Sequence, residues 1–193
     1  MVFLMTIYES LEEAQTYEDL DALLPQIAKG DNEAFKKFYE QTKASVYGFA
    51  LSLLKNTHDA EDVMQNVYVN IYHTASQYVS LGKPMAWVLT ITKNLCLLKF
   101  RRQSREAEFS EELQNSISLS DNMNIDDKML VEFCLNILKG DERKIVVLHA
   151  VSGLKHREIG ELLGLPLGSV ISKYNRALTK IKNYLKGGEY GDE

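Results

Sequence analysis

Apolar residues recur at three- and four-residue spacing along most of this 193-residue chain, and no stretch alternates convincingly with a period of two. Such spacing puts the apolar side chains on one face of an α-helix, whereas a half-buried strand needs strict alternation. Hydrophobic residues make up 45% of the chain, which is enough for packed cores. The sequence therefore predicts an all-α protein.

One segment interrupts this helical pattern. Residues 105–127, "REAEFSEELQNSISLSDNMNIDD", are polar, acidic and rich in Ser and Asn, which is typical of a flexible linker. We therefore expect two small helical domains, at 28–104 and 128–187, joined by this linker. An acidic N-terminal extension, 1–27, and a short tail, 188–193, complete the predicted organisation.

The stretch "HREIGELLGLPLGSVISKYNRAL", residues 156–178, has the spacing of a helix-turn-helix. Gly160 lets the second helix pack closely, and Gly164 supplies a left-handed turn that a side chain would resist. Pro166 suits the first turn of the next helix. The inner face of the first helix is expected to comprise Ile159, Leu162 and Leu163.

The second helix of this motif carries an apolar stripe and a polar face about 110 to 120 degrees away. The apolar stripe comprises Val170, Tyr174, Ala177, Ile181 and Leu185. The polar face comprises Ser169, Ser172, Lys173 and Arg176. A recognition helix presents such a surface to DNA. The alternative is a generic helical hairpin whose polar face is only solvated.

The formal net charge of −5 conceals a blockwise distribution. Residues 143–186 carry nine bases and two acids, and residues 31–105 carry ten bases and six acids. Residues 106–142 carry ten acids and two bases. An acidic chain can therefore still offer basic surfaces to a polyanion.

In "DAEDVMQNVYVNIY", residues 59–72, one helical face is apolar and the other is polar. The inward residues are Ala60, Val63, Val67 and Ile71; the outward residues are Asp59, Asp62, Gln65, Asn66 and Asn70. Val69 projects from the middle of the polar face. This is either a solvated face with one apolar residue or a docking surface for a basic partner, with an acidic rim around an apolar contact.

The helix "PMAWVLTITKNLCLLKFRR", residues 84–102, follows the loop "SQYVSLGKP". Thr90, Lys93, Asn94, Leu97 and Arg101 share one face, which Arg102 and Arg105 extend. The expected inner side comprises Trp87, Ile91, Leu95 and Leu98, with Trp87 in the core and not a stacking platform. Basic and amide groups beside a loop suit backbone phosphates and unstacked bases.

Cys96 and Cys134 lie far apart within apolar helical patterns, without CxxC or paired His spacing. We expect two buried thiols in a reducing compartment, and neither a metal site nor a cofactor. The initial MVFLM is shorter than a signal-peptide core of about seven to fifteen residues. Since no apolar run approaches the roughly twenty residues of a membrane span, a cytoplasmic protein is expected.

The order of these parts resembles that of the extracytoplasmic-function sigma factors, minimal bacterial initiation subunits with two helical domains joined by a linker. The resemblance covers about residues 28–186. The helix at 59–72 looks like the family's polymerase-docking motif, the helix at 84–102 like its minus-ten helix, and the stretch 156–178 like its minus-thirty-five reader. The predicted domains at 28–104 and 128–187 then correspond to sigma regions 2 and 4.

The resemblance implies a role for each set of site residues. Contacts with core RNA polymerase are assigned to Asp59, Asp62, Gln65, Asn66, Val69 and Asn70. Contacts with the melted minus-ten strand are assigned to Tyr78, Ser80, Lys83, Thr90, Lys93, Asn94, Leu97, Arg101 and Arg102. Contacts with the minus-thirty-five element are assigned to Arg157, Ser169, Ser172, Lys173, Arg176 and Lys180.

The implied partners are core RNA polymerase, promoter DNA and an anti-sigma factor, and no enzymatic activity is expected. The chain departs from the family where Ile171, Asn175 and Leu178 stand in place of the usual Lys, His and Arg. Two alternatives stay open from the residues alone: a polymerase-independent helix-turn-helix regulator, and a sigma-like interaction protein.

Overall fold

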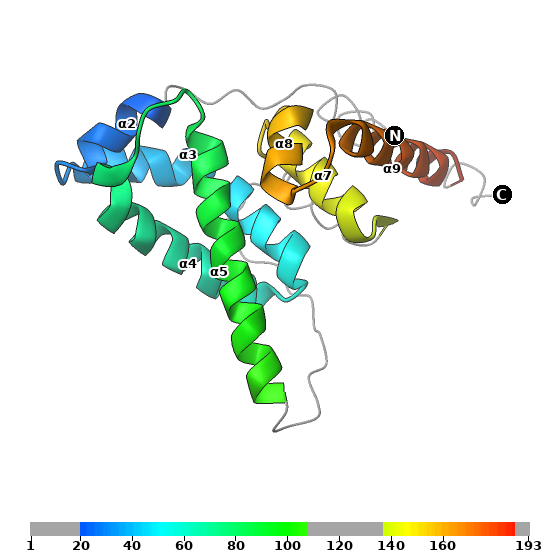
Figure 1. Cartoon of the computed structure of the whole chain (residues 1–193), viewed down its shortest axis with the longest axis horizontal. Coiled ribbons are helices and arrows are strands. Elements are labelled where there is room, and N and C mark those ends of the chain that lie inside the picture. Colours follow the sequence, from blue (N-terminus) through cyan, green and yellow to red (C-terminus); the bar gives the residue numbers. More distant parts are fainter. Residues whose placement is uncertain (1–19, 108–136, 188–193) are drawn as a thin grey trace. The chain divides into compact units, whose positions relative to one another are not determined.

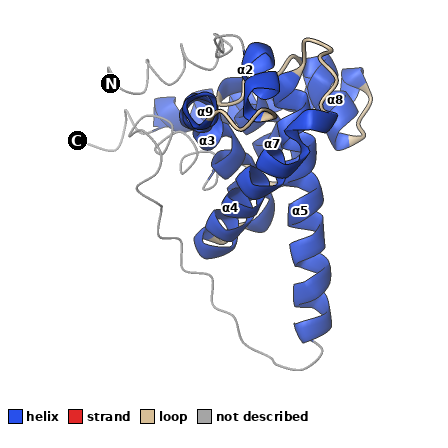
Figure 2. Cartoon of the chain, turned by 90° about the vertical axis from the view of Figure 1, so that its left-hand side faces the viewer, coloured by secondary structure: helices blue, strands red, loops and turns tan. Residues whose placement is uncertain are grey.

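The computed structural model describes residues 20–107 and 137–187, and every element in these ranges is helical, as Figures 1 and 2 show. The all-α prediction is confirmed. The chain divides into two compact units, each with its own core. Four parts of the predicted organisation lie outside the described residues: the residues before 20, the greater part of the predicted linker, Cys134 and the tail 188–193.

The first unit contains α2 (Leu20–Ile27), α3 (Asn32–Leu54), α4 (Thr57–Thr74), the short 3-10 helix η1 (Ala75–Gln77) and α5 (Pro84–Ala107). Helix α4 packs against both α3 and α5, and α2 packs against α3. Asp31 caps α3, because its carboxylate accepts hydrogen bonds from the backbone N–H groups of Glu33 (2.9 Å) and Ala34 (3.1 Å).

Helix α2 lies within the segment that the sequence assigned to an acidic extension. Its Leu20, Leu24 and Ile27 are buried, with at most 2% of each residue exposed. Because these side chains contribute to the core of the first unit, that unit begins before the expected boundary at residue 28. Pro25 lies inside this helix.

The four predicted inward residues of α4 are all buried, but the expected inner side of α5 is wrong. The residues of α5 that the core buries are Met85, Val88, Leu89, Thr92 and Cys96. Leu98 is 42% exposed and Trp87 is half-buried. Thr92 can face inward because its hydroxyl donates a hydrogen bond to the backbone carbonyl of Val88 (3.0 Å). The buried hydroxyl of Thr92 is therefore satisfied.

The second unit contains α7 (Gly140–Ala150), α8 (His156–Leu163) and α9 (Leu167–Gly187), and α8 and α9 form the predicted helix-turn-helix. Gly164 ends α8 in the left-handed conformation, with φ of 70°, and its N–H donates to the carbonyl of Gly160. An added Cβ at Gly160 would lie 2.8 Å from the carbonyl oxygen of Leu165. Both glycines are therefore required by the turn, as the sequence indicates.

Three rings, one from each helix, pack against one another in this unit. His149 of α7 stacks on His156 of α8, with ring centroids 4.6 Å apart. Tyr174 of α9 meets both rings edge-on, at 5.0 and 4.7 Å. Burial, together with the neighbouring His149, lowers the pKa of His156. The neutral imidazole is therefore the form that suits this packing.

Replacing Gly160 with alanine should destabilise the second unit by about 1–3 kcal/mol, because the new Cβ collides with a backbone oxygen that cannot rotate away. Gly168→Ala is the matched control. Gly168 lies in α9 with no atom within 4 Å of an added Cβ, so this change should be neutral or stabilising by up to about 1 kcal/mol. Urea denaturation followed by circular dichroism measures both; equal stabilities would contradict the close packing.

Candidate nucleic-acid and partner interfaces

The outward face of α4 divides into two parts. Gln65, Asn66 and Val69 are exposed, and Val69 reaches 56%. Asp59 and Asp62 instead contact α5, where Lys99 Nζ lies 2.8 Å from Asp59 Oδ1 and 3.0 Å from Asp62 Oδ2. Of the six predicted docking residues, these two carboxylates therefore also help to hold α4 against α5.

The contacts between α4 and α5 determine the charge states of Asp59 and Lys99. Burial opposes ionisation of Asp59, but hydrogen bonds from Lys99 and from Gln103 (2.7 Å) outweigh it, so the pKa of Asp59 lies below its usual range. The same Asp59 contact raises the pKa of Lys99. Both groups are charged at neutral pH, and the ion pair is a fixed link between the two helices.

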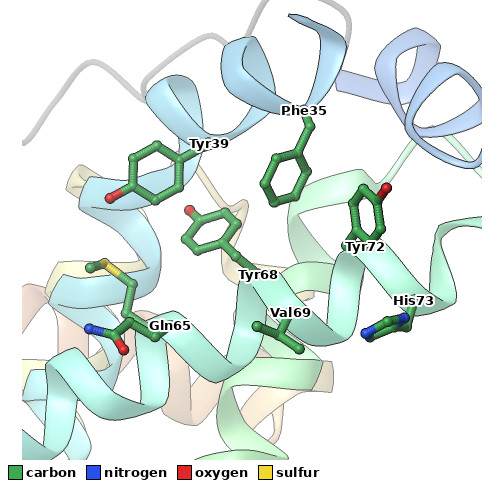
Figure 3. A pocket seen from close by; sticks show the side chains of 8 residues that line it. Phe35, Tyr39, Gln65, Tyr68, Val69, Tyr72 and His73 are labelled. Atoms are coloured by element: carbon green, nitrogen blue, oxygen red, sulfur yellow. The ribbon is translucent and has the colours of Figure 1, made fainter. Parts of the chain in front are cut away.

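An aromatic groove of ≈ 390 Å³ opens beside the exposed part of α4 (Figure 3). Phe35 and Tyr39 of α3 face Tyr68 and Tyr72 of α4, with edge-to-face ring contacts of 5.6 Å for Phe35–Tyr72 and 4.6 Å for Tyr39–Tyr68. Val69 and Gln65 also line the groove. Sequence reasoning missed these aromatic residues. Phe35 and Tyr39 are four residues apart on α3, as are Tyr68 and Tyr72 on α4, so the two rings of each helix share one helical face.

The loop between η1 and α5 is held by a residue that the sequence did not single out. Asp21 of α2 accepts hydrogen bonds from the hydroxyl groups of both Tyr78 and Ser80. These bonds, that of Ser80 first, lower the pKa of Asp21. Burial and the Asp21 contact raise the pKa of Tyr78 to about 12. Two predicted minus-ten residues are thus positioned by α2.

Apolar and aromatic groups accompany this loop. The ring of Tyr78 packs against that of Trp87 at 5.0 Å. Val79 and Leu81 are 69% and 77% exposed, respectively. Behind the loop, the predicted α5 face presents exposed Thr90, Asn94, Leu97, Arg101 and Arg102, with Lys93 half-buried; Lys83 at the end of the loop is exposed. The structure therefore brings the predicted minus-ten residues onto one continuous stretch of loop and helix.

In the second unit, the four basic residues predicted to contact DNA each form an ion pair. Lys173 Nζ lies 2.9 Å from Asp141 Oδ2, and Lys180 Nζ lies 2.6 Å from Glu142 Oε2. Arg176 Nε lies 3.8 Å from Glu142 Oε1. Arg157 pairs with Glu161 on α8 at 3.4 Å. Asp141 and Glu142 belong to the first turn of α7, and the sequence analysis assigned neither to this site.

The two α7 carboxylates are well suited to hold these cations. The first turn of a helix favours negative charge, because the helix dipole is positive there. Hydrogen bonds from Lys144 and Lys173 lower the pKa of Asp141. The side chain of Glu142 is only 13% exposed, so water screens its two pairs less than it would on an open surface. The basic side of α9 is therefore drawn toward α7.

Taken together, the folds and surfaces define a two-unit, all-α protein with a helix-turn-helix in one unit and exposed α4 and α5 faces in the other. The family described as Sigma-70 region 2 matches residues 38–106, and Sigma-70, region 4 matches residues 128–181. The first match covers α4 and α5 with most of α3, and the second covers the helix-turn-helix.

Curated relatives give the family more closely. The chain is 30% identical over 176 residues to the ECF RNA polymerase sigma factor SigK of Mycobacterium ulcerans, covering 87% of this chain and 94% of the relative. SigK of Mycobacterium tuberculosis is 29% identical over 175 residues, covering 86% and 94%. The chain belongs to the ECF RNA polymerase sigma factors. It is a sigma factor that directs promoter recognition, as the resemblance implies.

Two solved structures share the fold. CnrH, in complex with the cytosolic domain of CnrY, is 23% identical with a TM-score of 0.56, covering 88% of this chain and 99% of that one. The sigma factor RpoE of Bartonella quintana, in complex with the anti-sigma factor NepR, is 23% identical with a TM-score of 0.63, covering 83% and 99%.

Replacing Glu142 with glutamine should raise the affinity of the free full-length chain for duplex DNA about two- to fivefold at low salt. The change removes the carboxylate that pairs with Arg176 and Lys180. Because both cations are more than half exposed, each pair is worth roughly 0.2–1 kcal/mol. The salt dependence should steepen by about 0.9 for each base that gains a phosphate.

Glu40→Gln is the matched control, since Glu40 pairs with Lys43 in the first unit and the net charge changes equally. Fluorescence anisotropy across a salt titration measures both variants. An equal gain in both would mean that net charge, and not the α7 carboxylate, limits DNA binding.

Proposed function

We propose that the chain docks on core RNA polymerase through the exposed part of α4 and contacts promoter DNA through two further surfaces. The loop at 78–83 and α5 would bind the melted minus-ten strand, and α9 would bind the minus-thirty-five element. The observation that carries this proposal is the placement of the three predicted motifs on separate exposed surfaces of folded units that match sigma regions 2 and 4.

For polymerase docking, we assign the central role to Gln65, Asn66 and Val69. These side chains are exposed, whereas Asp59 and Asp62 pair with Lys99 of α5. The aromatic groove beside Val69 offers apolar area at the centre of a polar face, which is the arrangement that gives interfaces most of their binding energy. Asn70 and the two aspartates would contribute at the rim.

For promoter opening, the loop supplies apolar and aromatic surface next to hydrogen-bonding groups. A base leaving the stack could rest on Val79 or Leu81, while Lys93, Arg101 and Arg102 attract the phosphates. Capture of unstacked bases shifts the duplex toward its open form without any covalent step. Sigma factors are non-enzymatic transcription factors, and we propose that this chain likewise acts by binding alone.

The domain limits are also part of the proposal. We assign region 2 to 28–104 with α2 added, and region 4 to 128–187, while 105–127 would connect them through the polymerase. CnrH and RpoE were each solved with a partner, which in the case of RpoE is named an anti-sigma factor. We propose an anti-sigma partner for this chain as well.

The cellular location is also a proposal. No helix in the parts of the chain that the structure describes is long and apolar enough to cross a membrane. A sigma factor must meet polymerase and chromosomal DNA, and we therefore propose a cytoplasmic location.

The double substitution Gln65→Ala and Val69→Glu should weaken binding to purified core polymerase at least tenfold, since it removes an apolar contact and a polar one from the centre of the docking face. Both positions are exposed, so stability should change by no more than about 0.5 kcal/mol. Binding is measured by anisotropy with labelled chain, and folding by thermal denaturation.

The reciprocal control is Thr90→Ala with Asn94→Ala on α5. This variant should bind core polymerase like the wild type but support less promoter-dependent transcription in a reconstituted assay. Wild-type core binding by the α4 variant would remove the docking assignment. Tight sequence-specific DNA binding by the free wild-type chain would instead favour the polymerase-independent regulator.

A further inference from the structure

The outward face of the first turns of α9 is electrically neutral. Leu167 and Ile171 are 47% and 41% exposed, and Gly168, Ser172 and Asn175 are exposed beside them. In a helix-turn-helix, the N-terminal residues of the second helix are the ones that reach base edges in the major groove. These neutral residues therefore make up the exposed surface of the part of α9 where sequence is read.

The ion pairs with α7 explain why this face is neutral. Between residues 167 and 175 Lys173 is the single basic residue, and its ammonium lies 2.9 Å from Asp141. Arg176 and Lys180 follow further along the helix and pair with Glu142. The cations thus lie on the side of α9 toward α7, where they can meet the phosphate backbone at the edge of the groove.

The chemistry of the exposed residues selects among bases. Guanine is usually read by Arg or Lys, and cytosine by Asp or Glu. None of these four residue types occurs among the outward residues of these turns. An Asn side chain can form two hydrogen bonds with adenine, because its NH₂ group donates to N7 and its oxygen accepts from the N6 amino group. An apolar side chain packs on the thymine methyl group. Both residue types are present, as Asn175 and Ile171.

The positions of these two side chains also fit a single short step of DNA. Ile171 and Asn175 are four residues apart on one helix, which places them about 6 Å apart along the axis and about 40 degrees apart around it. Successive base pairs are about 3.4 Å apart. The two side chains therefore address base pairs that are adjacent or separated by one.

We propose that the chain reads A·T base pairs in its minus-thirty-five element through Ile171 and Asn175, with Ile171 contacting a thymine methyl group and Asn175 an adenine. Lys173, Arg176 and Lys180 contribute affinity through phosphates and no base preference. This inference rests on the proposed function of α9 as the minus-thirty-five reader.

The experiment uses holoenzyme reconstituted from the full chain and purified core polymerase. A duplex library randomised over the minus-thirty-five element is selected for promoter complexes, and each thymine of the selected sequence is then replaced by uracil. Loss of one thymine methyl should weaken the wild-type complex about fourfold, the value of burying one such group. Ile171→Ala holoenzyme should bind the thymine and uracil duplexes equally.

Asn175→Ala should lose about tenfold in discrimination between A·T and G·C at one nearby position. Lys173→Gln is the control, and should weaken all duplexes by a similar factor while lowering the salt slope by about 1. Selection of G·C pairs at every position, or equal sensitivity of wild type and Ile171→Ala to uracil, would overturn the inference. A holoenzyme that forms no promoter complex at all would instead overturn the proposed function.

Discussion

The packing of α4 between α3 and α5 is the constraint on which the first unit depends. Its buried stripe, from Ala60 to Ile71, fixes the rotation of the helix, because turning it would expose apolar side chains and bury polar ones. That rotation directs Gln65 and Val69 outward and aims Asp59 at Lys99 of α5. The buried hydrogen bond between the hydroxyl groups of Thr42 and Tyr68, 2.9 Å long, adds a specific link to α3. The outward face that we propose for docking is available because the opposite face of α4 is buried in the core.

In the second unit, contacts between helices likewise fix the positions of charged side chains. The α7 carboxylates lie where the helix dipole favours them, and they engage cations of α9 that lie 32 and 38 residues later in the chain. An acidic protein therefore carries a basic helix whose Lys173, Arg176 and Lys180 each pair with a carboxylate of α7. Free cations bind DNA phosphates independently of sequence. Pairing of the α9 cations with the α7 carboxylates therefore makes DNA binding depend more on sequence-dependent contacts. In the function proposed above, this pairing would give core polymerase a larger part in bringing the two units to one promoter.

The loop at 78–83 shows how a small element can link segments with different apparent roles. Asp21 comes from a segment that composition alone marks as an acidic extension, yet it orders two hydroxyl groups of the loop that we assign to the minus-ten strand. The exposed Val79 and Leu81 are left beside these fixed groups. An ordered loop loses less conformational entropy when it binds a base, so α2 would favour the binding of the minus-ten strand that we propose for this loop.

The sequence by itself determined the helical class, the helix-turn-helix with its two required glycines and the inward stripe of α4. Each of these rests on local rules: residue spacing, backbone conformation and hydrogen bonds to near neighbours. Tertiary structure decided the rest. It placed Thr92 and Cys96 of α5 inward in place of Ile91 and Leu98, because a satisfied threonine hydroxyl is compatible with a core. It also brought Asp21 to the loop, Phe35 to Tyr72, and Asp141 and Glu142 to α9. Contacts between residues distant in the chain depend on how whole helices pack, which the residue spacing within each helix does not specify.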